Sequence, residues 1–365
     1  MSKQLSAAGI VLFSLLTALA ALAQEPSIPQ KVVTSVGIYD IQSPRDIHKF
    51  SAREIRQLVQ MERERGPGPE TIPHPVLIYC FDEKSFPYTG GKYQNTEIKY
   101  RLHTPKSVRF GRKYPLIVHL HGIGEAGSDN ISSLIHLHSI LPVLIGPESE
   151  DFFMLVTQCP PETPGWIFRS DKDGTLDVLM AAMEHVIAEN PIDKKRITAT
   201  GVSSGGWGVW ELLSRHPEIF AGAVPTSCDT AYHLSRLSAL KKTQVWSFIN
   251  KGDTSVNPES IRTAMQTING SGGSMALTEA DEPGHNAWAP AMETYDCFRW
   301  MLAQKRGSWF SPPPGTIVHN TSKPFLPALA MFVLPLAIIV FLSWRTIYEQ
   351  ATNVWQTLRE RLNKN

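Results

Sequence analysis

Short apolar runs alternate with helix-like stretches through the middle of the chain. The runs are bounded by glycine, proline or charged residues, as buried strands of a parallel sheet are, and they lie at 96–105, 114–122, 152–160, 196–202, 220–228 and 243–250. Apolar residues recur at helical spacing in 175–191, 206–220 and 291–307. Strands that alternate with helices predict an α/β fold, with a mostly parallel sheet covered by helices on both faces.

Two further apolar stretches lie near the ends of the chain. Residues 1–23 begin with the basic Lys3 and end in small residues at Ala21 and Ala23, which predicts a cleaved signal peptide rather than an uncleaved N-terminal anchor. Phe325–Trp344 is 20 residues long and carries no charge, so it predicts a transmembrane helix. We therefore expect a single-pass membrane protein whose main domain is extracytoplasmic, in the periplasm or at the cell surface. The alternative is a freely secreted protein.

The segment before the α/β pattern has no visible role. Ser51 is followed by Glu54, a capping-box spacing that predicts one short surface helix. A stretch rich in proline and glycine, 66–75, follows it. The predicted organisation is a signal peptide at 1–23, an N-terminal extension at 24–92, the α/β domain at 93–307, a Pro-rich linker at 308–324, the transmembrane helix at 325–344 and a cytoplasmic tail at 345–365.

The stretch GVSSG, Gly201–Gly205, lies between a predicted strand and a predicted helix. It fits G-x-S-x-G, the pattern of a nucleophile elbow, in which a sharp turn exposes the serine. Glycine is needed on both sides because larger side chains would collide in such a turn. A chance match is the plainer alternative, but the flanking strand and helix argue against it. Ser203 is therefore the predicted nucleophile.

A serine nucleophile needs a histidine base and an acid, which follow the serine along the chain in this type of fold. His285, in a glycine-flanked loop before the last helix, is the predicted base. Asp253, after a late strand, is the predicted acid, with Asp229 as second choice. Four other candidates fit this order or the loop positions less well: His216, His233, His319 and Asp281.

The negative oxygen formed by nucleophilic attack requires two backbone N–H donors. One is predicted at Ser204, the residue after the nucleophile. The other is predicted in the loop after the strand at 114–122, where glycines allow close approach of the substrate. In that loop we favour the amide of Ile123, with Gly122 as the alternative.

The histidine pairs His119/His121 and His136/His138 raise the alternative of a zinc site. No Asp or further His follows the first pair at short range, so we predict neither a metal nor another cofactor. The formal net charge of +1 gives no reason to expect nucleic acid as a partner. Export would permit disulfides, and four cysteines allow three pairings among Cys80, Cys159, Cys228 and Cys297.

Four stretches in this order carry a resemblance to a known family: YPLIVHLHGIGEAGSDN, VTQCPPETPGW, the stretch 192–225 around the elbow, and GHNAWAPAM. They resemble the α/β-hydrolase family of exported esterases and predicted peptidases related to polyhydroxybutyrate depolymerases and feruloyl esterases. The resemblance runs from about Tyr93 to Gly307. It implies a triad of Ser203, Asp253 and His285, and an oxyanion loop at 122–124. The chain departs from the family at Ile249 and Asn250, where a His-Gly pair is usual.

The function expected from these observations is a membrane-anchored serine hydrolase that cleaves carboxylic esters of small molecules or polymers. The alternatives are a serine peptidase with the same triad and a non-catalytic surface-binding protein. Trp166, Trp207 and Trp288 lie beside the motifs and are candidates for lining an acyl or sugar pocket, although core packing is the plainer role of each. The sequence leaves the oligomeric state open.

Overall fold

The computed structural model of the protein describes residues 31–34, 37–40, 50–65, 73, 75–147, 149–160, 165–166, 174–230, 234–293, 297–308 and 317–318. All of them belong to one compact unit, Met1–Thr321. Within these ranges no helix combines the length and the apolar character that a membrane crossing requires. The predicted signal peptide, 1–23, and the predicted transmembrane helix, 325–344, lie outside the described residues, so both stay predictions.

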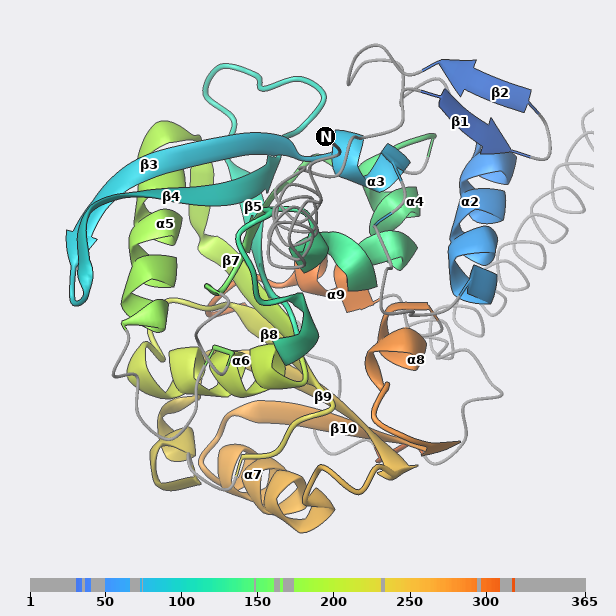
Figure 1. The fold of residues 1–365 in the computed structure, drawn as a ribbon. Coiled ribbons are helices and arrows are strands. Elements are labelled where there is room, and N and C mark those ends of the chain that lie inside the picture. Colours follow the sequence, from blue (N-terminus) through green and yellow to red (C-terminus); the bar gives the residue numbers. More distant parts are fainter. Residues whose placement is uncertain are drawn as a thin grey trace, which may run out of the picture. The chain divides into compact units, whose positions relative to one another are not determined.

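A nine-stranded sheet forms the centre of this unit, in the order β11-β10-β9-β8-β7-β5-β6-β4-β3 (Figure 1). Neighbouring strands from β6 to β11 in this order are parallel, whereas β4 is antiparallel to both β3 and β6. The mostly parallel α/β sheet is therefore confirmed. Its strands are β3 (Asp82–Gly90), β4 (Tyr93–His103), β5 (Tyr114–Leu120), β6 (Phe153–Thr157), β7 (Ile192–Val202), β8 (Gly222–Thr226), β9 (Gln244–Gly252), β10 (Ser274–Pro283) and β11 (Ile317–Val318).

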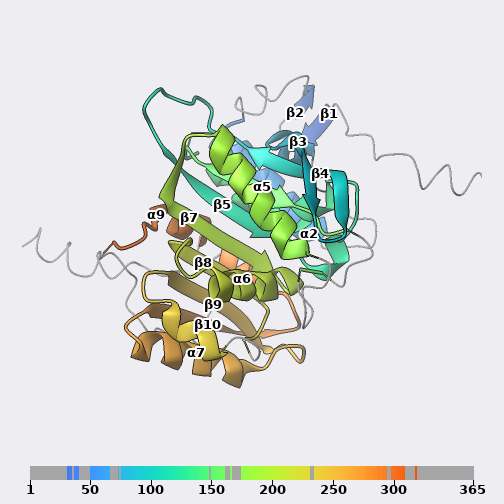
Figure 2. The same cartoon turned by 90° about the vertical axis from the view of Figure 1, so that its left-hand side faces the viewer.

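Helices cover both faces of the sheet. One apolar core packs between the sheet and α5, α6 and α7, and a second core packs between the opposite face and α2, α3, α4, α8 and α9 (Figure 2). Strand β5 divides its side chains between the two cores, as the alternation of a strand requires. The helices are α2 (Ala52–Arg65), α3 (Pro75–Tyr79), α4 (Leu141–Leu144), α5 (Thr175–Glu189), α6 (Ser204–Arg215), α7 (Pro258–Gly270), α8 (Trp288–Glu293) and α9 (Cys297–Ala303), with short 3-10 helices η2 (Ile123–Glu125), η3 (Ser132–Ile140) and η4 (Leu234–Ala239).

The sheet extends beyond the limits expected from the sequence. Strand β3 pairs with β4 along its length, so the sheet begins at Asp82 and not at residue 93, the predicted start of the α/β domain. Of the nine residues of β3 only Phe86 is buried, which explains why no apolar run marked this edge strand. Strand β11 falls within the predicted linker. Strand β10 and helix α7 were also not predicted, and the helix expected at 291–307 is the pair α8 and α9.

The predicted capping box forms at the start of α2. The backbone N–H of Ser51 donates to Glu54 Oε2 at 2.7 Å, and the N–H of Glu54 donates to Ser51 Oγ at 3.3 Å. The helix is not confined to the surface, because Ile55 and Leu58 are buried in the core that also holds α4. The extension thus contributes to the domain core. The other described elements of the extension are the hairpin strands β1 (Lys31–Thr34) and β2 (Gly37–Asp40), together with α3 and β3.

The four cysteines are buried, and each is present as a thiol and not in a disulfide: Cys80, Cys159, Cys228 and Cys297. None of the three disulfide pairings that the sequence allows is formed in this structure.

Candidate active site

Ser203 lies at the turn between the end of β7 and the start of α6. Its backbone has φ 52° and ψ −117°, a conformation rarely adopted by a residue with a side chain. The neighbouring glycines leave the space for this turn. A Cβ atom at Gly201 would collide with the carbonyl of Gly205, and one at Gly205 would collide with the carbonyl of Leu120. The strained turn therefore depends on both glycines, as a nucleophile elbow does.

Ser203, His285 and Asp253 form one hydrogen-bonded chain. His285 Nε2 lies 2.8 Å from Ser203 Oγ, and His285 Nδ1 lies 2.6 Å from Asp253 Oδ2. The Asp253 side chain is 1% exposed, whereas that of His285 is 30% exposed. With Nδ1–H donating to the carboxylate, Nε2 can accept the serine hydroxyl proton. The structure thus brings together the three residues that the sequence selected, in the order that serine catalysis requires.

The loop that carries His285 is fastened to two strands. The backbone N–H of Ala287 donates to Ser227 Oγ at 2.8 Å, just after β8. On the other side, Asn250 Nδ2 in β9 donates to the carbonyl of Gly284 at 3.0 Å and to Asn286 Oδ1 at 2.7 Å. Asn250 therefore holds residues on both sides of His285. Ser227 and Asn250 were not predicted as site residues, and only the departure from the family pattern at Asn250 pointed to one of them.

The rival acids have other partners. Asp229 accepts a hydrogen bond from Trp207 Nε1 at 3.4 Å and one from the N–H of Asn257 at 3.3 Å. The Asp281 side chain is 75% exposed and lies 3.6 Å from Lys251. Neither carboxylate contacts the ring of His285 in the described hydrogen bonds. His216 lies 3.8 Å from Glu218 at the end of α6, and the two other histidines weighed from the sequence, His233 and His319, lie outside the described residues.

The orientation of one peptide favours Ile123 over Gly122 as an oxyanion donor. His121 Nδ1 donates to the carbonyl of Gly122 at 2.5 Å, while its Nε2 accepts the N–H of Cys159 at 2.9 Å. In a trans peptide the N–H of Ile123 points opposite to the carbonyl of Gly122, and hence away from His121. The buried ring of His121 therefore fixes the direction in which the Ile123 amide is presented.

The amide of Gly122 lies beside a carboxylate instead. A Cβ atom built on Gly122 would stand 2.8 Å from Glu125 Oε2. The other oxygen, Glu125 Oε1, lies 3.2 Å from His136 Nε2. Burial alone would raise the pKa of Glu125, but the hydrogen bond from His136 and the electrostatic influence of the His136 and His121 rings lower it below its usual value. An anion beside the Gly122 amide makes it a poor partner for a second negative oxygen.

The second predicted donor, Ser204, begins α6 and has close neighbours. A Cβ atom at Gly165 would stand 2.8 Å from Ser204 Oγ and 3.8 Å from the side chain of Ile123. Gly165 has φ 91°, which favours glycine at this position. Ser204 is buried and Ile123 is 54% exposed. The two predicted oxyanion residues thus both lie close to Gly165, and one of them, Ile123, is exposed to solvent.

The contacts of the His119/His121 pair argue against a shared metal ion. His119 is buried, and both of its ring nitrogens lack a hydrogen-bond partner among the described residues. Burial, with smaller contributions from His121 and His136, lowers the pKa of His119 to about 3. Neither ring nitrogen of His121 is open, because both take part in the hydrogen bonds described above. The part of the chain that the structure describes contains no group of three or more His, Cys, Asp or Glu side chains placed to hold a metal ion.

The three predicted tryptophans lie at different distances from the triad. The Trp288 ring stands edge-on to His285 with centroids 6.0 Å apart, and 5.0 Å from the ring of His136. Trp166 is 2% exposed and packs 5.1 Å from the ring of His121. Trp207 is partly buried and donates to Asp229. Of these three tryptophan rings, that of Trp288 packs against a triad side chain, whereas Trp207 reaches the triad through its backbone N–H, which donates to the carbonyl of Ser203 at 3.1 Å.

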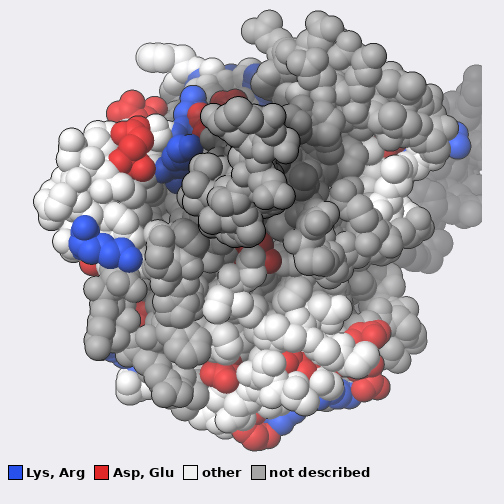
Figure 3. Space-filling model, viewed as in Figure 1, with Lys and Arg blue, Asp and Glu red and all other residues white. Residues whose placement is uncertain are grey.

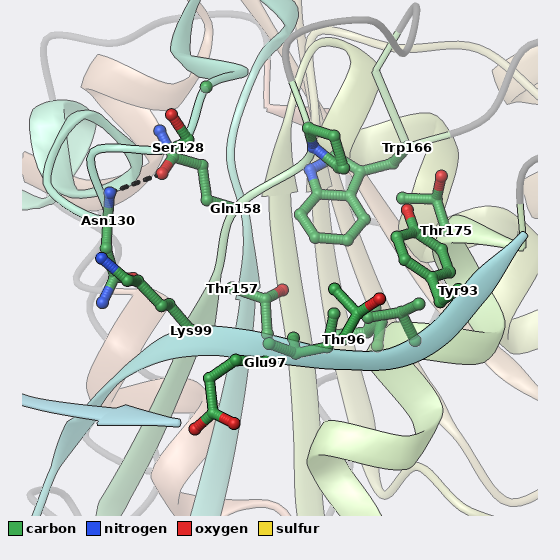
Figure 4. A pocket seen from close by; sticks show the side chains of 15 residues that line it. Tyr93, Thr96, Glu97, Lys99, Ser128, Asn130, Thr157, Gln158, Trp166 and Thr175 are labelled. Carbon is green, nitrogen blue, oxygen red and sulfur yellow. Dashed lines mark hydrogen bonds between the residues drawn. The ribbon is translucent and has the colours of Figure 1, made fainter. Parts of the chain in front are cut away.

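A pocket of about 600 Å³ lies beside Trp166, between β4, the loop after η2 and the start of α5. Figure 4 shows Trp166 and Tyr93 on one side of it, with Gln158 and Asn130 on the other. The side chain of Gln158 accepts the N–H of Asn130 at 2.7 Å and donates to the carbonyl of Glu125 at 3.0 Å. Gln158 thereby connects the pocket wall to the loop that presents Ile123. Of the three tryptophans considered from the sequence as pocket candidates, Trp166 lines this pocket; its other lining residues were not predicted.

The parallel sheet, the elbow and the Ser203–His285–Asp253 chain define the protein as an α/β-hydrolase. It belongs to the α/β-hydrolase superfamily, which has esterase and peptidase members. Residues 166–256 match the prolyl oligopeptidase family (Peptidase_S9). This stretch contains Ser203 and Asp253 but ends before His285. No curated protein sequence matches the chain.

Several solved structures are similar to it. A thermostable esterase is 29% identical, with a TM-score of 0.54, over 63% of this chain and 64% of its own. An acylaminoacyl peptidase of Pyrococcus horikoshii is 13% identical, with a TM-score of 0.48, over 63% of this chain and 43% of its own. A ferulic acid esterase is 14% identical, with a TM-score of 0.46, over 61% of this chain and 97% of its own. The chain therefore spans less than two thirds of the length of the first two.

Proposed function

We propose that the protein hydrolyses carboxylic esters through an acyl-enzyme intermediate on Ser203. The observation that carries this proposal is the continuous contact from Ser203 Oγ to His285, at 2.8 Å, and from His285 to Asp253, at 2.6 Å. An ester is favoured as substrate because the thermostable esterase, whose structure is similar to this chain with a TM-score of 0.54, acts on esters.

In the first half of the reaction Ser203 Oγ attacks the ester carbonyl while His285 Nε2 takes the hydroxyl proton. Asp253 stabilises the imidazolium and keeps the proton on Nδ1. The negative oxygen of the tetrahedral intermediate accepts hydrogen bonds from the backbone N–H groups of Ile123 and Ser204. The tetrahedral intermediate collapses when His285 returns the proton to the alcohol oxygen, which leaves.

In the second half His285 removes a proton from water, and the resulting attack on the acyl carbonyl releases the acid and restores Ser203. Every proton transfer in this cycle passes through one ring nitrogen of His285. The partial exposure of the His285 side chain, 30%, leaves room for substrate and water at that nitrogen.

A serine peptidase is the second candidate, because residues 166–256 match the prolyl oligopeptidase family. The two functions share the triad and differ in the leaving group, which is an alcohol in one case and an amine in the other. The experiment compares p-nitrophenyl esters of increasing acyl length with peptide p-nitroanilides. We expect turnover of the esters. Efficient cleavage of the anilides, with only slow ester turnover, would establish the peptidase.

The location of the enzyme is a separate proposal that rests on the sequence. The signal peptide at 1–23 would direct the chain out of the cytoplasm, and the apolar segment at 325–344 would stop its transfer. The hydrolase domain would then face the periplasm or the cell exterior. Resistance of the full chain to an alkaline carbonate wash would support the anchor, and complete release by that wash would contradict it.

A further inference from the structure

Basic pairs recur at the amino ends of the parallel strands. Arg112 and Lys113 directly precede β5, Lys194 and Lys195 lie at the start of β7, Lys241 and Lys242 precede β9, and Lys305 and Arg306 follow α9. The amino ends of parallel strands meet at one end of a sheet, which places these segments together. We call this end the basal face and define it by residues 104–113, 190–196, 241–243 and 304–308.

Backbone contacts join three of these segments. The N–H of Tyr114 donates to the carbonyl of Pro191 at 2.9 Å, and the N–H of Arg306 donates to the carbonyl of Lys195 at 2.8 Å. Figure 2 shows the β4–β5 loop and the end of α9 at the side of the sheet opposite to the strand arrowheads. Three of the four segments of the basal face are therefore directly linked, and the face lies away from the triad, which is built at the carboxyl ends of the strands.

The charges at the two ends of the sheet differ in sign. Five described acidic side chains lie at or beside the amino ends of the parallel strands: Glu150, Asp151, Glu189, Asp193 and Glu218. Two of them pair with arginines, Glu150 with Arg299 at 3.2 Å and Asp151 with Arg112 at 3.1 Å. Among the described residues at the carboxyl ends of the parallel strands and directly after them, the acidic side chains are Glu125, Asp129, Asp229, Asp253, Asp281 and Glu282, and Lys251 is a basic one. Since the formal net charge of the chain is only +1, the excess at the basal face is a local asymmetry. By contrast, both signs alternate along the rim over α7 (Figure 3).

A turn at the basal face holds two apolar side chains outward. Val108 is 53% exposed and Phe110 is 108% exposed. The turn closes through the N–H of Arg112, which donates to the carbonyl of Arg109 at 3.2 Å. The buried Tyr114 fixes its base, because the Tyr114 hydroxyl accepts the N–H of Arg109 at 2.9 Å and donates to the carbonyl of Ser107 at 3.2 Å. The tip is thus an ordered structure that exposes a whole phenyl ring among cations.

We propose that the basal face docks on an anionic lipid bilayer, with Val108 and Phe110 entering the interface and the basic pairs facing the headgroups. Cations near the surface and an apolar side chain below the headgroups are the two contributions that hold proteins at such interfaces. The acidic loops at the opposite end are repelled by the same surface. Docking therefore orients the candidate active site away from the membrane.

The chain length is compatible with this orientation. Seven positions along the chain separate Val318 in β11 from Phe325, which starts the predicted transmembrane segment, and they extend over at most about 24 Å. Val318 pairs with Thr278, four residues from the start of β10 at Ser274, or about 13 Å along the strand. The segment can therefore enter a bilayer that lies against the basal face. A nucleic acid or an acidic protein would use the cations but would gain less from the outward apolar side chains.

The test places a polarity-sensitive fluorophore on the tip. The four native cysteines are at most 7% exposed, so Val108→Cys can be labelled selectively in the full chain. A matched label at Asp281→Cys, on a side chain that is 75% exposed near the carboxyl end of β10, is the control. Both proteins are reconstituted with vesicles of phosphatidylglycerol and phosphatidylcholine, and with vesicles of phosphatidylcholine alone. Quenching by doxyl-labelled lipids measures the docked fraction, and ester turnover checks that the domain is folded.

We expect quenching of the label at position 108 on anionic vesicles, its reduction by salt, and no quenching at position 281. Phe110→Ala should lower the docking equilibrium constant about tenfold, and Lys113→Gln about fivefold. The proposal is overturned if the label at position 108 stays in water on anionic vesicles, if zwitterionic vesicles act equally, or if the control label is quenched instead. Binding to heparin without any quenching on vesicles would overturn it in favour of a soluble polyanion.

Discussion

Replacement of His119 by leucine should make the protein less sensitive to acid. The His119 ring is buried in the central strand β5 without a hydrogen-bond partner in the described ranges, and burial lowers its pKa to about 3. In the unfolded chain a histidine has a pKa of about 6.5. The unfolded state therefore binds a proton that the folded state does not between these two values. Stability is complete above about pH 6.5 and is lost progressively as the pH falls toward 3.

The size of this effect follows from the difference between the two pKa values. The unfolded state holds an extra proton at this site over the roughly 1.5 pH units between its pKa of about 6.5 and pH 5. Lowering the pH from about 7.5 to 5 therefore reduces the free energy of unfolding by about 2 kcal/mol. His119→Leu removes this loss and also removes a buried N–H without a partner, whose cost is about 1–3 kcal/mol. The variant should therefore be at least as stable as the parent at neutral pH.

Urea unfolding of both proteins at the two pH values measures this difference. The parent should lose about 2 kcal/mol more than His119→Leu on going from about pH 7.5 to pH 5. Carboxylates elsewhere titrate in both proteins, so the comparison removes their contribution. Equal losses in the two proteins would show that the ring of His119 has a partner or reaches solvent, and the argument from burial would be refuted.

Three further predictions concern the site. Asp253→Asn should lower kcat by about 10⁴ because His285 would hold the wrong tautomer, whereas Asp229→Asn should change kcat far less, and equal losses would contradict the assignment of the acid. His121→Phe should lower kcat about tenfold to a hundredfold, because the Ile123 amide loses its fixed direction. The variant should also bind a trifluoromethyl ketone inhibitor more weakly by the same factor. An unchanged inhibition constant would argue against this role of His121. Asn250→Ala should slow labelling by a fluorophosphonate, because it removes hydrogen bonds that hold the His285 loop, and should shift the thermal midpoint by no more than a few degrees. Unchanged labelling would show that the hydrogen bond to Ser227 alone is enough to hold the loop.

The residues of the triad could be selected from the sequence because their chemistry restricts where they can stand. Ser203 has a short local pattern, with glycines required by the turn, and the chain order of the fold then leaves few choices for the acid and the base. The apolar strands were also predictable, since a strand buried on both faces must be continuously apolar. Strand β3 was not, because an edge strand with one buried residue has no such pattern.

The supporting residues could not be predicted from the sequence, because they act across long separations. Ser227 contacts a residue 60 positions later, and Asn250 contacts one 36 positions later, so no local pattern marks either of them. His119 and His121 illustrate the opposite problem. Their spacing suggested a metal pair, but one ring lies in an apolar core and the other is used to fix the loop before Ile123. Only the three-dimensional neighbours distinguish these roles.

Labelling with a fluorophosphonate, followed by peptide mass spectrometry, tests the central claim most directly. We expect one adduct per chain, on Ser203, and we expect ester hydrolysis to be lost in parallel with adduct formation. Ser203→Ala should abolish the adduct and lower kcat by about four to six orders of magnitude, whereas Ser238→Ala, at an exposed serine of η4, should change neither. An adduct on another residue, or ester hydrolysis that persists in Ser203→Ala, would contradict the assignment of Ser203 as the nucleophile.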